Sequence, residues 1–415
     1  MFDRVKAAGD VQISKISLIT KKGEVDLMLV FLEANIYEDI HSPALSAVIT
    51  ITDTQGLLQK LPITGNEVIK LEYQTPGFDN SNRISQDFII TKIADKSIGA
   101  TDHHLVYNLY CVTPEAAVDM GMKISKKFEG TADTVIRKIL REYFRTDKQM
   151  TYDIPGNSIS FVSPFWSPFK VISYYATQST KTTTQAPNYM FFETNKQYKF
   201  SSLETLYEKA PVCTYRHDNN PLKKDGIRDI QSEYEQCLEV YFGDQYNEKD
   251  RIDAGIHHTT AYIHDVTSKS LKSVRFGYTE SFAKTQHLGK YPMIPNETAK
   301  HRIVTHKQSY TKGHNNFNID NSGYVRNMRT PLLYDLELLK LDITVYGRTD
   351  LEVGDIVEFQ MNTWNEKTNT DKSAPQEDKY YNGKYIITAM HHRLNQHQHQ
   401  IVMQIAKNAS EAPLS

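Results

Sequence analysis

A short strand-like sequence occurs twice in this chain, nearly 300 residues apart. Residues 88–93 read FIITKI and residues 385–390 read YIITAM, an offset of 297 positions. After a polar turn, each is followed by a second apolar-rich run, HLVYNLY at 104–110 and QIVMQIA at 400–406, at an offset of 296. We therefore predict one hairpin near each end of the chain, with turns that differ in length by one residue.

The repeat extends upstream of both hairpins. Residues 61–65 (LPITG) lead into VIKL at 68–71, and residues 351–354 (LEVG) lead into IVEF at 356–359, with Gly65 aligned to Gly354 at an offset of 289. Each copy reads as a strand, a glycine turn, a strand, a long polar loop and a hairpin. A duplicated β-unit allows a ring of n chains to present 2n similar units, which builds a quasi-symmetric ring from few subunits.

The first copy belongs to a β-rich region, and a different texture follows it. Residues 10–113 alternate strand-like runs with Gly and Pro turns, which is typical of a small antiparallel barrel. Residues 114–228 are predicted to form an α+β middle domain, with helices beginning near Thr131 and at Ser167 and a hairpin made by 189–192 and 198–200. The buried stripe of the first helix is expected to be Val135, Ile136, Ile139, Leu140, Tyr143 and Phe144.

The second copy completes a chain that is α+β in class and mainly β. We assign residues 229–243 and 332–408 to a second barrel and residues 244–331 to an inserted, polar, β-rich domain. The overall prediction is two similar tube-type antiparallel β-barrels, an α+β middle domain and a further inserted domain. Residues 362–376 are polar and aperiodic, so we expect a mobile loop that becomes ordered against a partner.

Composition excludes several classes of protein. The chain has 48 Lys and Arg against 50 Asp and Glu, so it lacks the basic surplus expected of a dedicated nucleic-acid-binding protein. Its longest apolar stretch, residues 27–32, is far shorter than the ~20 residues of a membrane-spanning helix. Three widely spaced cysteines fit neither a disulfide framework nor a zinc site. We expect a soluble protein made in a cytoplasm, without membrane insertion.

Residues able to carry chemistry are present, but their spacing does not mark a site. Fifteen histidines include His391, His392, His397 and His399, which we interpret as solvated turn residues of the last hairpin rather than metal ligands. The middle region holds candidates for the carboxylate pair of a glycosidase, which we interpret as solvated surface acids: Glu142, Asp153, Glu204 and Glu208. Phosphate loops and a nucleophile elbow are absent from the sequence. We predict no catalytic, cofactor or metal site.

Three stretches resemble one family, the central hub proteins of contractile-tailed (T-even-like) phage baseplates, which are related to the hub part of type VI secretion spike proteins. Residues 61–71 are similar to the turn of the family's first barrel, residues 347–359 to its last barrel, and residues 385–408 to its closing strands. The order of helix, Pro-initiated helix and aromatic hairpin in the middle region also fits.

The resemblance implies a structural protein of the virion, assembled in the host cytoplasm, and not an enzyme. In that family the hub is a homotrimer whose two barrels alternate in a pseudo-sixfold ring. The ring joins the sixfold tail tube, or its initiator protein, to the threefold spike, lies among the other baseplate proteins, and leaves a lumen through which DNA passes.

The strands expected to take equivalent places in this ring carry Phe88, Ile90, Lys92, Tyr385, Ile387 and Ala389. The alternative is a tail-tip enzyme that degrades a cell-wall polymer through the middle domain.

Overall fold

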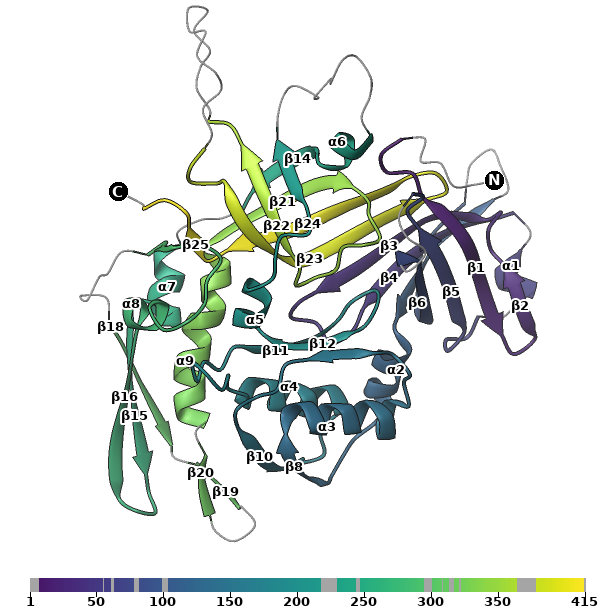
Figure 1. Cartoon of the computed structure of the whole chain (residues 1–415). Coiled ribbons are helices and arrows are strands. Elements are labelled where there is room, and N and C mark those ends of the chain that lie inside the picture. The colour runs from purple at the N-terminus through teal and green to yellow at the C-terminus, as the bar shows by residue number, and fades with distance from the viewer. Residues whose placement is uncertain are drawn as a thin grey trace, which may run out of the picture.

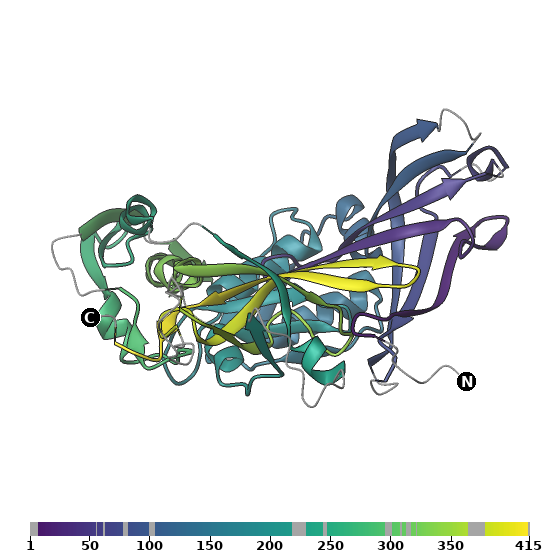
Figure 2. The same ribbon diagram turned by 90° about the horizontal axis from the view of Figure 1, so that it is seen from above.

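The computed structural model describes residues 7–54, 56–60, 63–77, 82–98, 104–217, 230–243, 247–294, 301–307, 309–312, 317–320, 322–363 and 378–413. One large sheet runs through the molecule, with the middle domain packed against one side of it (Figure 1). The N-terminal strands and the inserted domain lie at opposite ends, and the C-terminal strands lie between them (Figure 2). The protein is mainly β with some helices, as predicted.

The large sheet has thirteen strands, which come from both ends of the sequence. Its N-terminal part contains β1 (Gln12–Thr20), β2 (Gly23–Asp26), β3 (Phe31–Asp39), β4 (Ser46–Asp53), β5 (Val68–Gln74), β6 (Ile84–Ile98) and β7 (Leu105–Val112), with α1 (Leu57–Lys60). Its second part contains β13 (Thr214–His217), β14 (Cys237–Phe242), β21 (Leu339–Tyr346), β22 (Ile356–Met361), β23 (Gly383–Asn395) and β24 (His399–Lys407), with α6 (Ile230–Tyr234). We call these the first and second β-units.

The two β-units have the same strand order. The first runs β3-β4-β7-β6-β5-β1 and the second runs β14-β21-β24-β23-β22-β13. The predicted duplication is therefore visible in the topology. One pairing differs, because β1 lies antiparallel to β5 whereas β13 lies parallel to β22.

Irregularities recur at matching places in the two β-units. A bulge lies between Ile90 and Lys92 where β6 pairs with β7, and another lies between Ile387 and Ala389 where β23 pairs with β24. The first strand in the order of each unit also has a bulge at a matching place. It lies between residues 31 and 33 in β3 and between residues 237 and 239 in β14. Since a bulge fixes local bend and register, the copies share geometry at these places. The further irregularity between Ala94 and Ser97 in β6 has no counterpart where β23 pairs with β24.

Register corrects two details of the predicted repeat. Ile90 pairs with Cys111 and Ile387 pairs with Ile405, so the second hairpin strands are offset by 294 residues (111 to 405) and not by 296. The backbone N–H of Asn66 donates to Ile90 O, as that of Gly354 donates to Ile387 O, so Gly354 corresponds to Asn66 and not to Gly65. The predicted offset of the second hairpin strands was wrong by two residues. Because side chains alternate between faces along a strand, a shift of two leaves each side chain on its expected face.

The two closed barrels expected from the sequence are not present in the described part of the chain. The thirteen strands form one open sheet, and the second β-unit approaches closure only through a single bridge between Arg216 and Gln236. The first β-unit has its own core, centred on residues such as Phe31, Phe88 and Tyr107. The second shares its core with the middle domain through Met190 and Phe192.

The middle domain has the predicted α+β character. Helices α3 (Ala132–Ile139) and α4 (Pro168–Gln178) pack together, and the expected stripe of α3 is buried except for the half-buried Tyr143. The aromatic hairpin is β11 (Tyr189–Glu193) and β12 (Tyr198–Ser202). All five residues of β11 are buried, because its two faces contact two different cores. The remaining elements are α2 (Pro114–Gly121), β8 (Lys127–Thr131), the π-helix η2 (Leu140–Phe144), β9 (Met150–Tyr152), β10 (Ser158–Val162) and α5 (Leu203–Tyr207).

The inserted region is built around a three-stranded sheet in the order β16-β15-β18. Helix α9 (Ser322–Tyr334), which the sequence analysis did not predict, crosses the boundary placed at 331/332. The other elements are α7 (Glu248–Ala254), β15 (His258–Asp265), β16 (Ser270–Gly277), α8 (Tyr278–Phe282), β17 (Tyr291–Pro292), β18 (His301–Lys307), β19 (Ser309–Lys312), β20 (Phe317–Asp320), η3 (Asp335–Glu337) and β25 (Ala409–Ser410). No described helix is long and apolar enough to cross a membrane. Residues 364–376 of the predicted loop lie outside the described residues.

The equivalent turn residues Gly354 and Asn66 allow the cost of backbone strain to be tested with a matched control. Gly354 has φ +84° and a Cβ there would meet Phe192 Cζ at 3.0 Å, whereas Asn66 holds φ 79° at the equivalent, exposed position. We expect Gly354→Ala to lower the free energy of unfolding by about 1–3 kcal/mol and Asn66→Gly to change it by about 0.5 kcal/mol or less. Urea denaturation followed by circular dichroism measures both, and equal effects would contradict the strained-turn assignment.

Candidate functional site

The two β-units are joined by direct pairing of β23 with β3. Seven residue pairs form this joint, from Ala389 opposite Asp39 to Asn395 opposite Glu33. β23 is long enough to serve two partners along its length, because its first residues pair with β22 and its last residues pair with β3. The joint makes the sheet continuous, so the units lie side by side and not face to face.

A chain of buried polar groups crosses this joint. His392 Nε2 lies 3.0 Å from Glu38 Oε1 on β3, and His392 Nδ1 lies 3.0 Å from His399 Nε2 on β24. All three residues are almost fully buried. Burial lowers the pKa of His399 well below its usual range, and the neighbouring His392 lowers it further, so His399 is neutral.

The histidines were therefore misread as solvated turn residues. His392 and His399 are buried, and the ring of half-buried His391 stacks on Tyr37 with centroids 4.5 Å apart. His397 alone is exposed among the four. Within the described ranges, no group of three or more His, Cys, Asp or Glu is arranged to hold a metal ion.

The turn of the β11–β12 hairpin reaches the same joint. Asn195 Nδ2 donates to Glu38 Oε1 and lies 3.1 Å from His392 Nε2, and Gln86 Nε2 donates to Asn195 O at 2.6 Å. One buried turn residue of the middle domain thus contacts both β-units. The chemistry of these groups is structural, because an unpaired buried polar group is costly and each partner therefore fixes the others.

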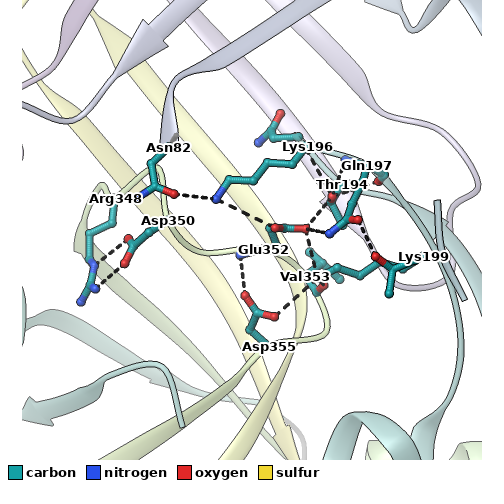
Figure 3. A network of polar contacts seen from close by, with 12 residues as sticks. Asn82, Thr194, Lys196, Gln197, Lys199, Arg348, Asp350, Glu352, Val353 and Asp355 are labelled. Carbon is teal, nitrogen blue, oxygen red and sulfur yellow. Dashed lines mark hydrogen bonds and ion pairs between the residues drawn. The ribbon is translucent and has the colours of Figure 1, made fainter. Parts of the chain in front are cut away.

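An ion-pair network beside the joint fixes the same hairpin to the second β-unit (Figure 3). Lys199 Nζ lies 3.1 Å from Glu352 Oε2 and 3.4 Å from Asp355 Oδ1, and it donates to Val353 O at 3.1 Å. Glu352 also accepts from Thr194 Oγ1 at 2.9 Å. Burial alone would raise the pKa of Glu352, but the charge of Lys199 and the hydrogen bond from Thr194 outweigh it and lower that pKa.

A second anchor ties the middle domain to the first β-unit. Glu193, at the end of β11, is fully buried and accepts from Leu45 N at 3.1 Å and Thr113 Oγ1 at 2.9 Å. Its other oxygen pairs with Lys148, which also lies 3.0 Å from Glu115. Burial lowers the pKa of Lys148, but the charges of Glu193 and Glu115 outweigh it and raise that pKa, so the lysine stays protonated.

Most of the six predicted ring residues lie inside the two units and not at the β23–β3 joint. Phe88 and Ile90 of β6 and Tyr385 and Ile387 of β23 are buried in the cores of their units. Lys92 is exposed over the ring of Tyr110, and Ala389 alone of the six belongs to the β23–β3 joint. Strands β6 and β23 hold equivalent positions in the strand order.

The candidate carboxylates have structural partners. Glu204 is buried, not solvated as the sequence analysis assumed, and accepts from Thr184 Oγ1 at 2.7 Å. Asp153 accepts from Ser202 Oγ at 3.1 Å and from Thr205 Oγ1. The exposed Glu142 and Glu208 make ion pairs with lysines at 3.8 Å. Sequence reasoning missed Glu38, Asn195, Lys199 and Glu352, and only the polar turn around Asn195 between two aromatic strands marked their place.

Lys199 offers a test of the hairpin anchor with a neighbouring control. Its side chain is 6% exposed, whereas that of Lys196 is 23% exposed and reaches Glu352 only at 3.9 Å. We expect Lys199→Met to lower the free energy of unfolding by about 3–5 kcal/mol, because it leaves Glu352 and Asp355 without their buried counter-charge. Lys196→Met should cost about 1 kcal/mol or less. Urea denaturation of both variants decides, and equal losses would contradict the anchor.

His391 makes the joint sensitive to acid. Burial, with the charges of Arg393 and His392, lowers its pKa from 6.5 to about 4. Because the folded-state pKa is depressed, the stability it contributes is present above pH 6.5 and is lost as the pH falls through about 4. We expect thermal melting to show a smaller loss of stability over this range in His391→Phe, which keeps the stack on Tyr37. An unchanged or steeper pH profile in the variant would contradict this.

Comparisons with solved structures show a shared fold. No protein-family model matches the sequence, and a search of curated proteins gives no match. A tail protein from Neisseria meningitidis MC58 aligns with TM-score 0.55 and 10% identity over 96% of this chain and 99% of that one. The 43 kDa tail protein of prophage MuSo2 from Shewanella oneidensis aligns with TM-score 0.55 and 8% identity over 95% and 98%. The similarity to phage tail proteins predicted from the sequence is confirmed, and this chain has the fold of those two proteins along almost its whole length.

Proposed function

We propose that this protein is the structural central hub of a phage tail baseplate. In this proposal three copies form a ring in which first and second β-units alternate, so that six tube-type modules face a sixfold tail tube or its initiator protein. The threefold face binds the spike, other baseplate proteins surround the ring, and DNA only passes through the lumen. The likeness to two tail proteins, one of them from a prophage, supports this assignment.

One observation supports the ring most directly. The strands equivalent to β23 and β3 do not pair with each other within the chain, so they can form the same joint between chains. The strand order makes β23 equivalent to β6 and β3 equivalent to β14. If the joint within a chain is repeated between chains, β14 of one copy pairs with the second half of β6 in the next. Repetition of one contact around an axis closes a ring of alternating units.

Both edges required for this contact are unpaired in the described part of the chain. On one side β6 pairs with β5 only as far as Ile89, so the stretch from Lys92 to Ile98 pairs with β7 alone. β14 pairs with β21 alone. Ile98 is 74% exposed and Tyr241 is 69% exposed. Exposed strand edges invite pairing with another chain, and a closed ring would cover them.

The register of the proposed contact follows from the repeat. Arg393 faces Asn35 within the chain, and the equivalent residues are Ser97 in β6 and Tyr241 in β14. Antiparallel neighbours have Cα atoms about 4.5–5.5 Å apart, which a disulfide spans. Cysteines at these two positions should therefore link adjacent copies.

We expect the variant Ser97→Cys/Tyr241→Cys to give disulfide-linked trimers after mild oxidation, read as mass on non-reducing gels and by mass photometry. The matched control is Ser97→Cys/Val240→Cys, because a shift of one residue turns the second cysteine to the other face of the strand. Trimers that form without the cross-link between positions 97 and 241 would contradict the pairing of β14 with β6 but not the trimeric ring. Particles of dimer mass at every concentration would contradict the hub ring itself.

The alternative of a wall-degrading enzyme receives less support. The carboxylates that it would use are engaged in hydrogen bonds to side-chain hydroxyls or in surface ion pairs. We propose that the middle domain acts as a brace, since its hairpin contacts the first β-unit through Glu193 and both β-units through Asn195. A zymogram on bacterial cell walls that shows clearing by the wild type but not by Asp153→Asn or Glu204→Gln would favour the enzyme.

A further inference from the structure

A basic cavity opens on the middle domain, and of the groups that anchor the hairpin only Lys148 lies in its lining. It measures about 670 Å³, and four cationic side chains line it together with one acid, Asp147: Arg137, Arg141, Arg145 and Lys148. Asp133 pairs with Arg137 at 3.0 Å, and Lys148 pairs with Glu115 and Glu193. Arg141 and Arg145 are exposed, and their side chains make no ion pair or hydrogen bond with any residue that the structure describes.

The end of one helix brings Arg141 and Arg145 to the cavity. Helix α3 continues into η2, which ends at Phe144 and is followed by Arg145 in the left-handed conformation with φ 53°. Arg141 lies within this π-helical turn and Arg145 directly follows it. A π-helical turn is uncommon and is often found at functional sites. Here it coincides with the side of the cavity that carries two unpaired cations.

The opposite wall of the cavity is a strand edge. β9 is the outer strand of the sheet β11-β12-β9 and contributes Met150 and Tyr152 to the lining. Gln149 O accepts from Tyr198 N at 2.9 Å and Asp153 N donates to Phe200 O at 2.8 Å, so the odd-numbered residues face β12. The peptide N–H and C=O groups of Met150 and Tyr152 therefore point away from β12, and no described strand pairs with this outer edge of β9.

We propose that this cavity binds an extended acidic peptide segment of another protein, which adds as a strand to the edge of β9 and places carboxylates on Arg141 and Arg145. Strand addition gives affinity through the backbone, and arginine–carboxylate pairs give specificity. A strand edge has no role in binding a nucleic-acid backbone, so the two walls together favour a peptide.

The test uses the purified full-length chain and a fluorescein-labelled octapeptide of alternating Glu and Val, with fluorescence anisotropy as the readout. We expect Arg141→Glu/Arg145→Glu to weaken binding at least about tenfold. The control Lys126→Glu/Lys127→Glu makes the same change in net charge on exposed lysines outside the cavity and should change affinity by about twofold or less. Circular dichroism confirms that each variant is folded.

Two further ligands separate strand addition from general charge attraction. The same octapeptide with alternate backbone nitrogens methylated keeps every carboxylate but cannot pair with β9, and it should bind at least about tenfold more weakly. A thymidine octanucleotide should bind more weakly than the peptide. No binding of the peptide, equal weakening by the control pair, or tighter binding of the oligonucleotide would overturn the proposal. None of these outcomes depends on whether the chain forms a ring.

Discussion

Seven residue pairs between β23 and β3 make two similar β-units into one sheet, and much of the structure serves to hold that joint. The buried chain Glu38–His392–His399 crosses it, and Asn195 from the middle domain contacts the first two members of the chain. Desolvating such groups is costly unless they are paired, so the network is weak evidence for stability but strong evidence for a specific arrangement. A slipped register would separate Glu38 from His392 and break this buried chain of polar groups.

The middle domain fixes the relative position of the two β-units. Its hairpin presents Glu193 to the first β-unit and Lys199 to the second, so one rigid element fixes the position of each unit relative to the other. The hairpin is well suited to this role because β11 is buried on both faces, between two cores. Gly354 allows close approach here, since Phe192 of β11 packs against it.

The repeat and the type of the major elements outside the inserted region were predictable from the sequence because both depend on local pattern, whereas α9 was not predicted. Both copies alternate aliphatic residues around a threonine that sits at the bulge, Thr91 in the first and Thr388 in the second. Thr91 Oγ1 donates to Tyr110 O, and Thr388 Oγ1 donates to Gln404 O. Pro168 at the start of α4 and the aromatic runs of β11 and β12 were equally local signals. The open sheet was not predictable, because the joining of β23 to β3 depends on residues 350 to 362 positions apart. His392 and His399 were misjudged for the same reason, since their polar neighbours in sequence gave no sign of the buried Glu38.

The central claim is that the geometry of the β23–β3 joint is used again between chains. Electron cryomicroscopy of the purified oligomer measures it directly, as the rotation that relates neighbouring β-units around the particle axis. The account predicts about 60° both within and between chains, since six equivalent units share one turn. Units packed face to face, or a particle in which β14 and the second half of β6 both remain exposed, would contradict it.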